Sequence, residues 1–280
     1  MLFKNLYKRK LSKPKKFIFV VGSGRCGTLY FKELFKNNNL IDAFHERNNL
    51  VTSFYQFAKY NNFKLDYKFL IDTFKKLKIK KKIYLESSSY LSLNIYEISK
   101  SFNSKIIILF RDPLKTCKSL MKKGWYNSMD LKNYSKNKNI GCHTNSRLYF
   151  HHNFSRLIPH KKDFAMWNKM PQIVKIKWFW NYIYKNLILQ SKKISKKKVK
   201  FINIDEFNYH KYLKLCLWIG CKPDLSYSNF KKVFKRSSNR IKEKSVYVNK
   251  NNLKLFKKNF IFSENFLIKK NFLPKNNLNK

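Results

Sequence analysis

One stretch decides the fold of this 280-residue chain: FIFVVGSGRCGT, residues Phe17 to Thr28. Its first half, Phe17–Val21, is an apolar run that predicts a buried parallel strand, and Leu29–Lys36 has the pattern of a helix. A glycine-rich turn between a strand and a helix N-terminus holds phosphate-like anions, because glycines let backbone N–H groups approach and the helix end carries partial positive charge. Residues 22–28 are therefore predicted to bind an anion.

The basic residue of this loop stands at a different position from the lysine in the phosphate-binding loop of nucleoside triphosphatases. Their loop reads G-x-x-x-x-G-K-[ST], with a lysine before the final hydroxyl residue. Gly22 and Gly27 have that spacing, but Thr28 follows directly and the lysine is missing. The positive charge comes earlier, from Arg25. The loop therefore suits an oxyanion that is held in a different way.

Four further apolar runs precede stretches with helix periodicity, namely Leu40–Phe44, Lys82–Leu85, Lys105–Phe110 and Lys200–Ile204. This alternation predicts an α/β fold with a central parallel sheet flanked by helices. Ligands of such sheets bind beyond the carboxyl ends of the strands. The residues that follow each run are therefore candidates for a site, among them His45, Glu46, Glu86, Arg111 and Asp205.

A second anion-binding motif is predicted where the run ending at Phe110 stops. Asp112 suits the N-cap of the next helix, and Pro113 suits its first position. Arg111 therefore emerges at the strand end, and Ser119 lies on that helix. Arginine offers a bidentate fork to a phosphate, and serine offers one hydroxyl donor. Taken alone, Arg111 could pair with a carboxylate and Ser119 could be an ordinary surface serine. The prediction of an anion site therefore depends on this motif and the 22–28 loop together.

Together the motifs resemble the sulfotransferases that use 3′-phosphoadenosine 5′-phosphosulfate (PAPS) as donor. VGSGRCGT is similar to the family's 5′-phosphosulfate loop, and Arg111-Asp-Pro with Ser119 eight residues later is similar to its 3′-phosphate motif. Further segments resemble family segments in the same order: Tyr84–Tyr90, Trp180–Tyr182 and Phe201–Phe207. The resemblance spans roughly residues 17–225 and implies a P-loop-like sulfotransferase fold.

The resemblance implies an enzyme that moves a sulfuryl group from PAPS to a hydroxyl or amine of a glycan, glycolipid or small metabolite, without a metal. Arg25 would be catalytic, because it neutralises charge on the leaving phosphate. Cys26 stands where the family usually has serine, and Leu29 where a second threonine is common. The implied donor-binding residues are Ser23, Gly24, Arg25, Cys26, Gly27, Thr28, Leu29, Arg111, Ser119 and, in a late closing loop, Arg240.

The resemblance also implies a base after the second strand, where His45 and Glu46 are adjacent. If the strand geometry continues through both residues, their side chains point to opposite sides, and one of them faces the acceptor. We favour Glu46 over His45 as the residue that takes the proton. A glutamate that pairs with Arg47 or a lysine is the alternative.

The chain carries a formal net charge of +47, from 62 Lys and Arg against 15 Asp and Glu. The lysines are spread over the whole sequence, and the abundant residues have A/T-rich codons, so codon composition explains much of the charge better than a nucleic-acid partner does. Five widely spaced cysteines without a CxxC pair predict neither a disulfide framework nor a zinc knuckle. We expect a cytoplasmic protein, with peripheral contact to an anionic membrane left open.

The predicted organisation is a basic segment over residues 1–16, a sulfotransferase-like α/β domain over 17–245 and a basic tail over 246–280. Residues 127–171 interrupt the strand–helix rhythm and are expected to form a lid or acceptor loop. The histidines there are interpreted as solvated: His143, His151, His152 and His160. Ile173–Ile194 predicts a long helix whose aromatic cluster packs in the core.

Three alternatives remain. A degenerate P-loop kinase or nucleotide-binding protein is disfavoured by the missing lysine and by the lack of an acidic cluster for magnesium. A non-catalytic basic polyanion-binding protein would need a concentrated basic patch or an RNA-binding motif, and the sequence has neither. A sulfotransferase-like protein that binds without catalysis also fits the sequence.

Overall fold

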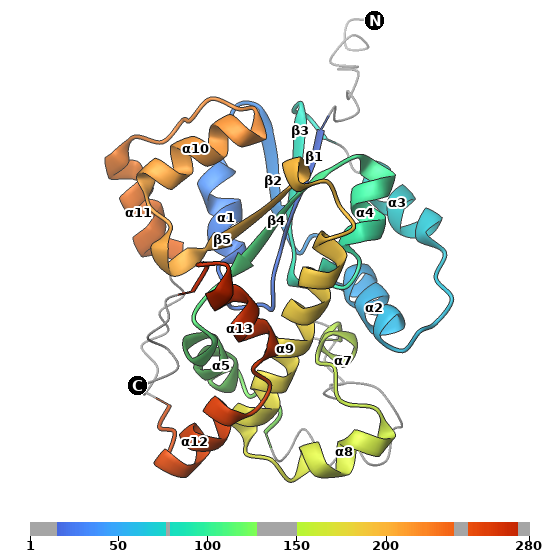
Figure 1. Ribbon diagram of the computed structural model, residues 1–280. Coiled ribbons are helices and arrows are strands. Elements are labelled where there is room, and N and C mark those ends of the chain that lie inside the picture. Colours follow the sequence, from blue (N-terminus) through green and yellow to red (C-terminus); the bar gives the residue numbers. More distant parts are fainter. Residues whose placement is uncertain (1–15, 77–78, 128–149, 238–245, 274–280) are drawn as a thin grey trace, which may run out of the picture.

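The computed structural model describes residues 16–76, 79–127, 150–237 and 246–273. Its centre is a five-stranded parallel sheet in the order β2-β3-β1-β4-β5 (Figure 1). Each strand lies within two residues of the predicted ends, which confirms the expected fold class. The strands are β1 (Lys16–Val21), β2 (Ile41–His45), β3 (Ile83–Ser87), β4 (Lys105–Phe110) and β5 (Val199–Asn203).

Helices cover both faces of this sheet (Figure 1). Two short 3-10 turns follow strands, η1 (Ser89–Leu91) after β3 and η4 (Ile204–Glu206) after β5, and η3 (Lys196–Lys198) precedes β5. The α-helices are α1 (Thr28–Phe35), α2 (Asn49–Tyr60), α3 (Tyr67–Lys75), α4 (Ile95–Phe102), α5 (Pro113–Met121), α7 (His152–Ser155), α8 (Lys161–Asn168), α9 (Gln172–Ser191), α10 (Tyr209–Ile219), α11 (Tyr227–Ser237), α12 (Lys250–Lys258) and α13 (Phe262–Lys269).

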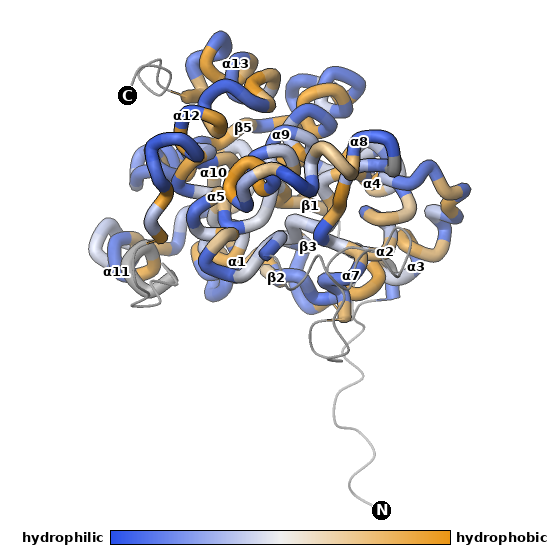
Figure 2. Tube along the Cα trace, turned by 90° about the horizontal axis from the view of Figure 1, so that it is seen from below, coloured by the Kyte–Doolittle hydropathy of each residue, from blue (hydrophilic) through white to orange (hydrophobic). Residues whose placement is uncertain are grey.

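The apolar alternation of β1 produces these two layers, because successive side chains of a strand point to opposite faces. Phe19 and Val21 pack into a cluster with α4 and α9. Ile18 and Val20 pack into a second cluster with α1 and α10. A strand that is buried on both faces reads as a continuous apolar run, as predicted for this one. In Figure 2, the helices carry hydrophilic and hydrophobic stretches in turn, as expected for helices with one buried face.

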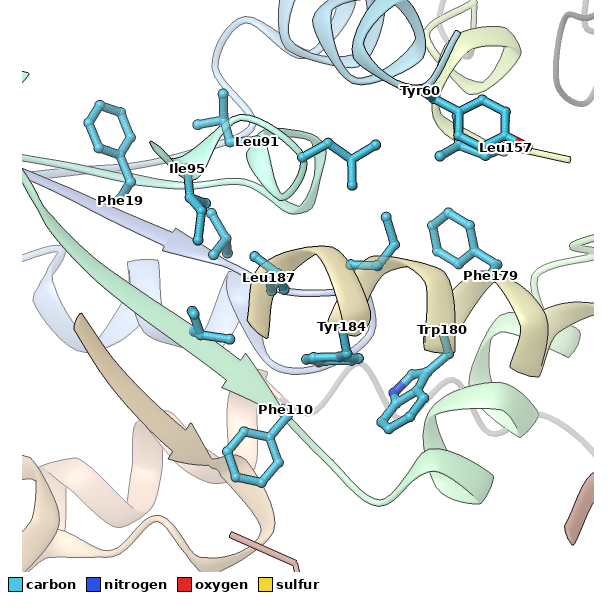
Figure 3. Packing of buried hydrophobic residues seen from close by; sticks show 14 of the residues in the cluster. Phe19, Tyr60, Leu91, Ile95, Phe110, Leu157, Phe179, Trp180, Tyr184 and Leu187 are labelled. Atoms are coloured by element: carbon cyan, nitrogen blue, oxygen red, sulfur yellow. The ribbon is translucent and has the colours of Figure 1, made fainter. Parts of the chain in front are cut away.

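Helix α9 packs into the core on one face of the sheet. Figure 3 shows α9 beside the carboxyl end of β4, with Tyr184 and Leu187 directed towards the sheet. Phe179, Trp180, Tyr184 and Leu187 are buried, while Trp178 and Tyr182 of the predicted cluster are partly buried and pack against the core. The prediction that this aromatic cluster belongs to the core is therefore confirmed.

The C-terminal helices are fixed to α9 by a buried ion pair. Lys177 on α9 is fully buried, its Nζ lies 3.0 Å from Glu264 Oε2 on α13, and it donates a 2.6 Å hydrogen bond to the Phe256 carbonyl on α12. Residues 246–273 therefore contain two packed helices, where the sequence had been interpreted as a basic tail. Within the described ranges, no helix has both the length and the apolar character that crossing a membrane requires.

Candidate functional site

The loop over residues 22–28 joins β1 to α1 and turns through left-handed backbone. Gly24, Arg25 and Gly27 have φ values of 77°, 54° and 99°. A Cβ on Gly27 would lie 2.8 Å from Ile204 Cγ1, so both the backbone angle and the space require glycine there. Thr28 begins α1, and the loop therefore presents its backbone at a helix N-terminus.

Buried contacts fix this loop from its protein-facing side. The Gly22 N–H donates to Ser92 Oγ at 3.2 Å, and that hydroxyl donates to the Gly22 carbonyl at 2.8 Å. The Tyr184 hydroxyl donates to the Leu109 carbonyl on β4 at 2.7 Å and would lie 3.4 Å from a Cβ on Gly22. A Cβ on Gly22 would lie 2.4 Å from Cys26 Sγ, so the chain is closely packed at this point.

The side chains of Cys26 and Ser23 point into the protein. Both residues are buried, and burial raises the pKa of the Cys26 thiol to about 11. Cys26 is therefore a neutral thiol at physiological pH. The Ser23 hydroxyl donates to the Gly24 carbonyl at 3.3 Å, while Leu29 is half-buried on α1.

Arg25 and Ser119 meet although 94 residues separate them. Arg25 Nε donates to Ser119 Oγ at 3.0 Å, which joins the loop after β1 to the helix after β4. These strands are neighbours in the sheet, and their carboxyl ends lie at the same edge. The structure thus brings together one residue from each of the two predicted anion-binding motifs.

Arg111 pairs with a carboxylate. Its Nε donates to Asp205 Oδ1 at 3.0 Å, and Lys115 Nζ lies 3.6 Å from Asp205 Oδ2. The predicted helix start is confirmed, because the Asp112 side chain accepts from the Lys115 N–H at 2.7 Å and Pro113 occupies the first turn. Asp205, in η4 after β5, therefore positions the basic residues at this end of the sheet.

His45 and Glu46 both reach the loop, by different routes. His45 Nε2 lies 3.2 Å from Thr28 Oγ1, and burial lowers the pKa of this imidazole below its ordinary value. Glu46 Oε1 accepts a 2.9 Å hydrogen bond from Ser89 Oγ. A Cβ on Gly24 would lie 3.7 Å from that same Ser89 Oγ, so this hydroxyl lies between the loop and Glu46.

The strand geometry on which the alternation of these two residues depended does not continue through Glu46. Strand β2 ends at His45, and Glu46 has a φ of 50°, which turns the chain out of strand geometry. The two side chains therefore do not point to opposite sides of one strand. Arg47 lies over the Phe44 ring, 4.4 Å from its centroid.

A buried carboxyl group lies under the site. Glu86 on β3 is 1% exposed, and its carboxyl group accepts from the Tyr84 hydroxyl at 2.5 Å and from the Arg47 N–H at 3.2 Å. Burial raises the pKa of Glu86 to about 7. Such a group titrates near physiological pH, and no local sequence pattern marks Glu86 as buried.

Histidines line the side of the site next to Ser89. The Tyr90 and His151 rings lie 5.5 Å apart, and His152 Nδ1 lies 3.3 Å from Arg156 Nη2. Burial and then Arg156 lower the pKa of His152 to about 3. The interpretation of these histidines as solvated was therefore wrong for His151, which is buried, and for the half-buried His152.

Two predicted residues, His143 and Arg240, lie outside the described residues. Sequence reasoning missed Ser92 and Tyr184, which hold the loop from below. The one available signal for Tyr184 was its place one helical turn after Trp180, on the same face of α9. In the described part of the chain, no three His, Cys, Asp or Glu residues form a group that could hold a metal ion.

The fold and the loop geometry define an α/β protein with a glycine-rich loop at the carboxyl end of its central strand. No protein-family model matches the chain, and no curated protein matches its sequence. Among solved structures, the sulfotransferase STF9 from Mycobacterium avium is similar, with a TM-score of 0.51 and 10% identity over 95% of this chain and 78% of that chain.

Two further solved structures that resemble this chain are also sulfotransferase domains. The sulfotransferase domain from the curacin biosynthetic pathway gives a TM-score of 0.46 at 10% identity, over 87% of this chain and 97% of that domain. The sulfotransferase domain from the Synechococcus PCC 7002 olefin synthase gives 0.42 at 9% identity, over 93% and 97%. The similarity to STF9 shows that this chain has the fold of a sulfotransferase.

Proposed function

We propose that this chain is a sulfotransferase that moves a sulfuryl group from PAPS to a hydroxyl or amine of an acceptor. The observation that carries the proposal is the 3.0 Å bond between Arg25 and Ser119. It joins the loop that resembles a 5′-phosphosulfate site to the serine that resembles part of a 3′-phosphate site. A donor with phosphates at both positions needs these two groups at one edge of the sheet.

The donor set has the chemistry that such an anion requires. The left-handed turn at Gly24 and Gly27 leaves no side chain between the loop backbone and a bound group at those two positions. Arg25 and Thr28 would hold the phosphosulfate, and Arg111 and Ser119 would hold the 3′-phosphate. Arg111 is oriented by Asp205 through its Nε atom. This arrangement suits catalysis by positioning and charge stabilisation.

The transfer forms a bond between the acceptor oxygen or nitrogen and sulfur, and breaks the bond between sulfur and the bridging phosphate oxygen. Arg25 would stabilise the negative charge that develops on that phosphate. The acceptor proton goes to a base, for which we propose Glu46. Its carboxylate is held by Ser89 next to Gly24 of the loop. His45 is the alternative base, and its lowered pKa keeps it neutral and able to accept a proton at pH 7.

Thermal-shift binding tests the donor site. Adenosine 3′,5′-bisphosphate should stabilise the protein without metal, and Arg25→Ala and Arg111→Ala should each weaken that stabilisation. The matched control is Lys254→Ala, which removes an exposed cation on α12. Stabilisation by ATP with magnesium alone would contradict the proposed donor and favour a kinase-like function.

Single-turnover transfer from labelled PAPS separates the two candidate bases. Glu46→Gln should lower the transfer rate while bisphosphate affinity stays unchanged, and His45→Asn should affect the rate less. The reverse order assigns the proton to His45. If wild-type protein binds the bisphosphate but labels no acceptor in a broad panel, the chain binds without catalysis.

A further inference from the structure

An exposed aromatic surface borders the candidate site. We name it the aromatic ridge and define it as Leu50, Phe54, Phe63, Phe150 and Phe154. Leu50, Phe54, Phe63 and Phe150 are 47%, 43%, 54% and 45% exposed. Contiguous apolar surface of this kind marks an interaction site, whereas single exposed apolar residues do not.

Ring contacts make the ridge one continuous surface. Phe154 lies 5.6 Å from Phe54 and 5.8 Å from Phe150, measured between ring centroids. The buried Phe57 connects the rest, 5.7 Å from Phe154 and 5.9 Å from Phe63. These rings come from α2, the turn after it and the segment around α7, and both Figures 1 and 2 show α2 and α7 side by side.

The ridge is continuous with the acceptor side of the site. Leu50 lies in the first turn of α2, four residues after Glu46. Phe150 precedes His151, whose ring contacts Tyr90 of η1. The hydroxyl of Ser89, the residue before Tyr90, bonds Glu46. A partner that binds to the ridge therefore lies next to the proposed base, Glu46.

The charge around the ridge selects an anionic partner. The stretches that contribute its side chains, residues 46–66 and 150–163, carry six lysines and arginines against three acidic residues. The exposed basic residues Arg47 and Lys64 bracket the α2 part of the ridge. A second copy of this chain is disfavoured, because two molecules of net charge +47 repel each other. An anionic bilayer offers both negative headgroups and an apolar layer in which aromatic rings reside.

We propose that the aromatic ridge docks on an anionic lipid surface and that the acceptor is a lipid headgroup hydroxyl or amine presented there. The docking half of this proposal rests on the exposed rings of the ridge and on the basic residues around it. The acceptor half rests on the proposed sulfotransferase function. Exposed rings insert at the interface while lysines and arginines contact the headgroups, as in other peripheral proteins. This geometry places Glu46 at the level of the headgroups.

Co-sedimentation with vesicles tests the docking. The protein should bind vesicles that mix phosphatidylcholine with phosphatidylglycerol and should not bind phosphatidylcholine alone, with binding reduced by salt. Phe54→Ser with Phe63→Ser should weaken binding on the order of 20-fold, because each ring gives up a half-exposed apolar surface. Phe63→Trp should retain binding. The matched control is Leu217→Ser, on α10, where the leucine is 82% exposed.

Several results would overturn the docking half. These are equal binding by the double variant and the Leu217 control, no binding by wild-type protein, or a dimer that the double variant dissociates in size-exclusion chromatography. An unchanged melting temperature shows that the variants fold. Bisphosphate stabilisation, measured on the same samples, tests the proposed function separately, because the ridge is not part of the donor site.

Labelled PAPS tests the acceptor half on vesicles of phosphatidylglycerol, phosphatidylinositol and phosphatidylethanolamine, whose headgroups carry free hydroxyls or an amine. Label should enter the lipid phase, and the double ridge variant should reduce its rate. Absence of label from the lipid phase overturns this half. Vesicle binding without bisphosphate binding would contradict the proposed function and leave the docking in place.

Discussion

The carboxyl group of Glu86 makes a sharp prediction about stability and pH. It lies on β3, which pairs with β1 and β2, is 1% exposed, and has a pKa raised from 4.5 to about 7, mainly by burial. Below pH 4.5 the group is protonated in both the folded and the unfolded chain. As pH rises from 4.5 to 7, the unfolded chain releases this proton and the folded chain keeps it, so the free energy of unfolding falls.

The size of this effect follows from the two pKa values. A difference between 4.5 and about 7, at 1.36 kcal/mol per pKa unit, corresponds to about 3 kcal/mol lost between pH 4.5 and pH 7.5. Glu86→Gln keeps an oxygen that accepts from the Tyr84 hydroxyl and removes the titration. The wild-type protein should therefore lose about 3 kcal/mol relative to this variant over that pH range.

Urea unfolding of both proteins, followed by tryptophan fluorescence, measures this difference at each pH. Titrations elsewhere in the chain cancel in the comparison, because the two proteins share them. A difference in unfolding free energy that stays constant from pH 4.5 to pH 8 would refute the reasoning. A difference that changes in favour of the wild-type protein as pH rises would refute it as well.

Two further predictions concern the packing around the site. Gly27→Ala combines a φ of 99° with a close approach to a neighbouring side chain, so it should cost about 2 kcal/mol and weaken bisphosphate binding. Gly124→Ala has a similar φ of 69° and a closest contact of 3.4 Å, and should leave that binding unchanged in the same thermal-shift assay. Lys177→Met leaves Glu264 buried without its cation and should cost about 3–5 kcal/mol in chemical unfolding. The double variant Lys177→Met with Glu264→Leu should recover most of that loss, and a double variant as unstable as the single one would contradict the ion-pair explanation.

The strands could be predicted because their sequence signal is local. An apolar run such as Lys105–Phe110 is buried on both faces, and no tertiary information is needed to recognise it. The turn at Glu46 could not be predicted, because its positive φ has no marker in a non-glycine residue. The burial of Lys177 was also hidden, because its partner Glu264 is distant in sequence and lies in a stretch rich in lysine and asparagine.

The residues of the candidate site could likewise be predicted where local motifs mark them, and their contacts could not. Arg25 and Ser119 were both singled out from local motifs, while their contact depends on the order of β1 and β4 in the sheet. The support from Tyr184 depends on the angle at which α9 crosses the strand ends, which no local pattern determines. The donor-binding roles of these residues remain predictions, which the binding experiments test.

The bond between Arg25 and Ser119 has a consequence for the thermodynamics of donor binding. A long arginine side chain loses rotamer freedom when a ligand immobilises it, at a cost of about 0.5–1.5 kcal/mol. Here the bond to Ser119 already orders the guanidinium in the donor-free protein. Much of that rotamer freedom is therefore lost on folding and not on donor binding. Calorimetry should accordingly show a smaller entropic penalty for adenosine 3′,5′-bisphosphate in the wild-type protein than in Ser119→Ala. The serine would then serve the donor twice, through its own hydroxyl and through the order it imposes on its neighbour.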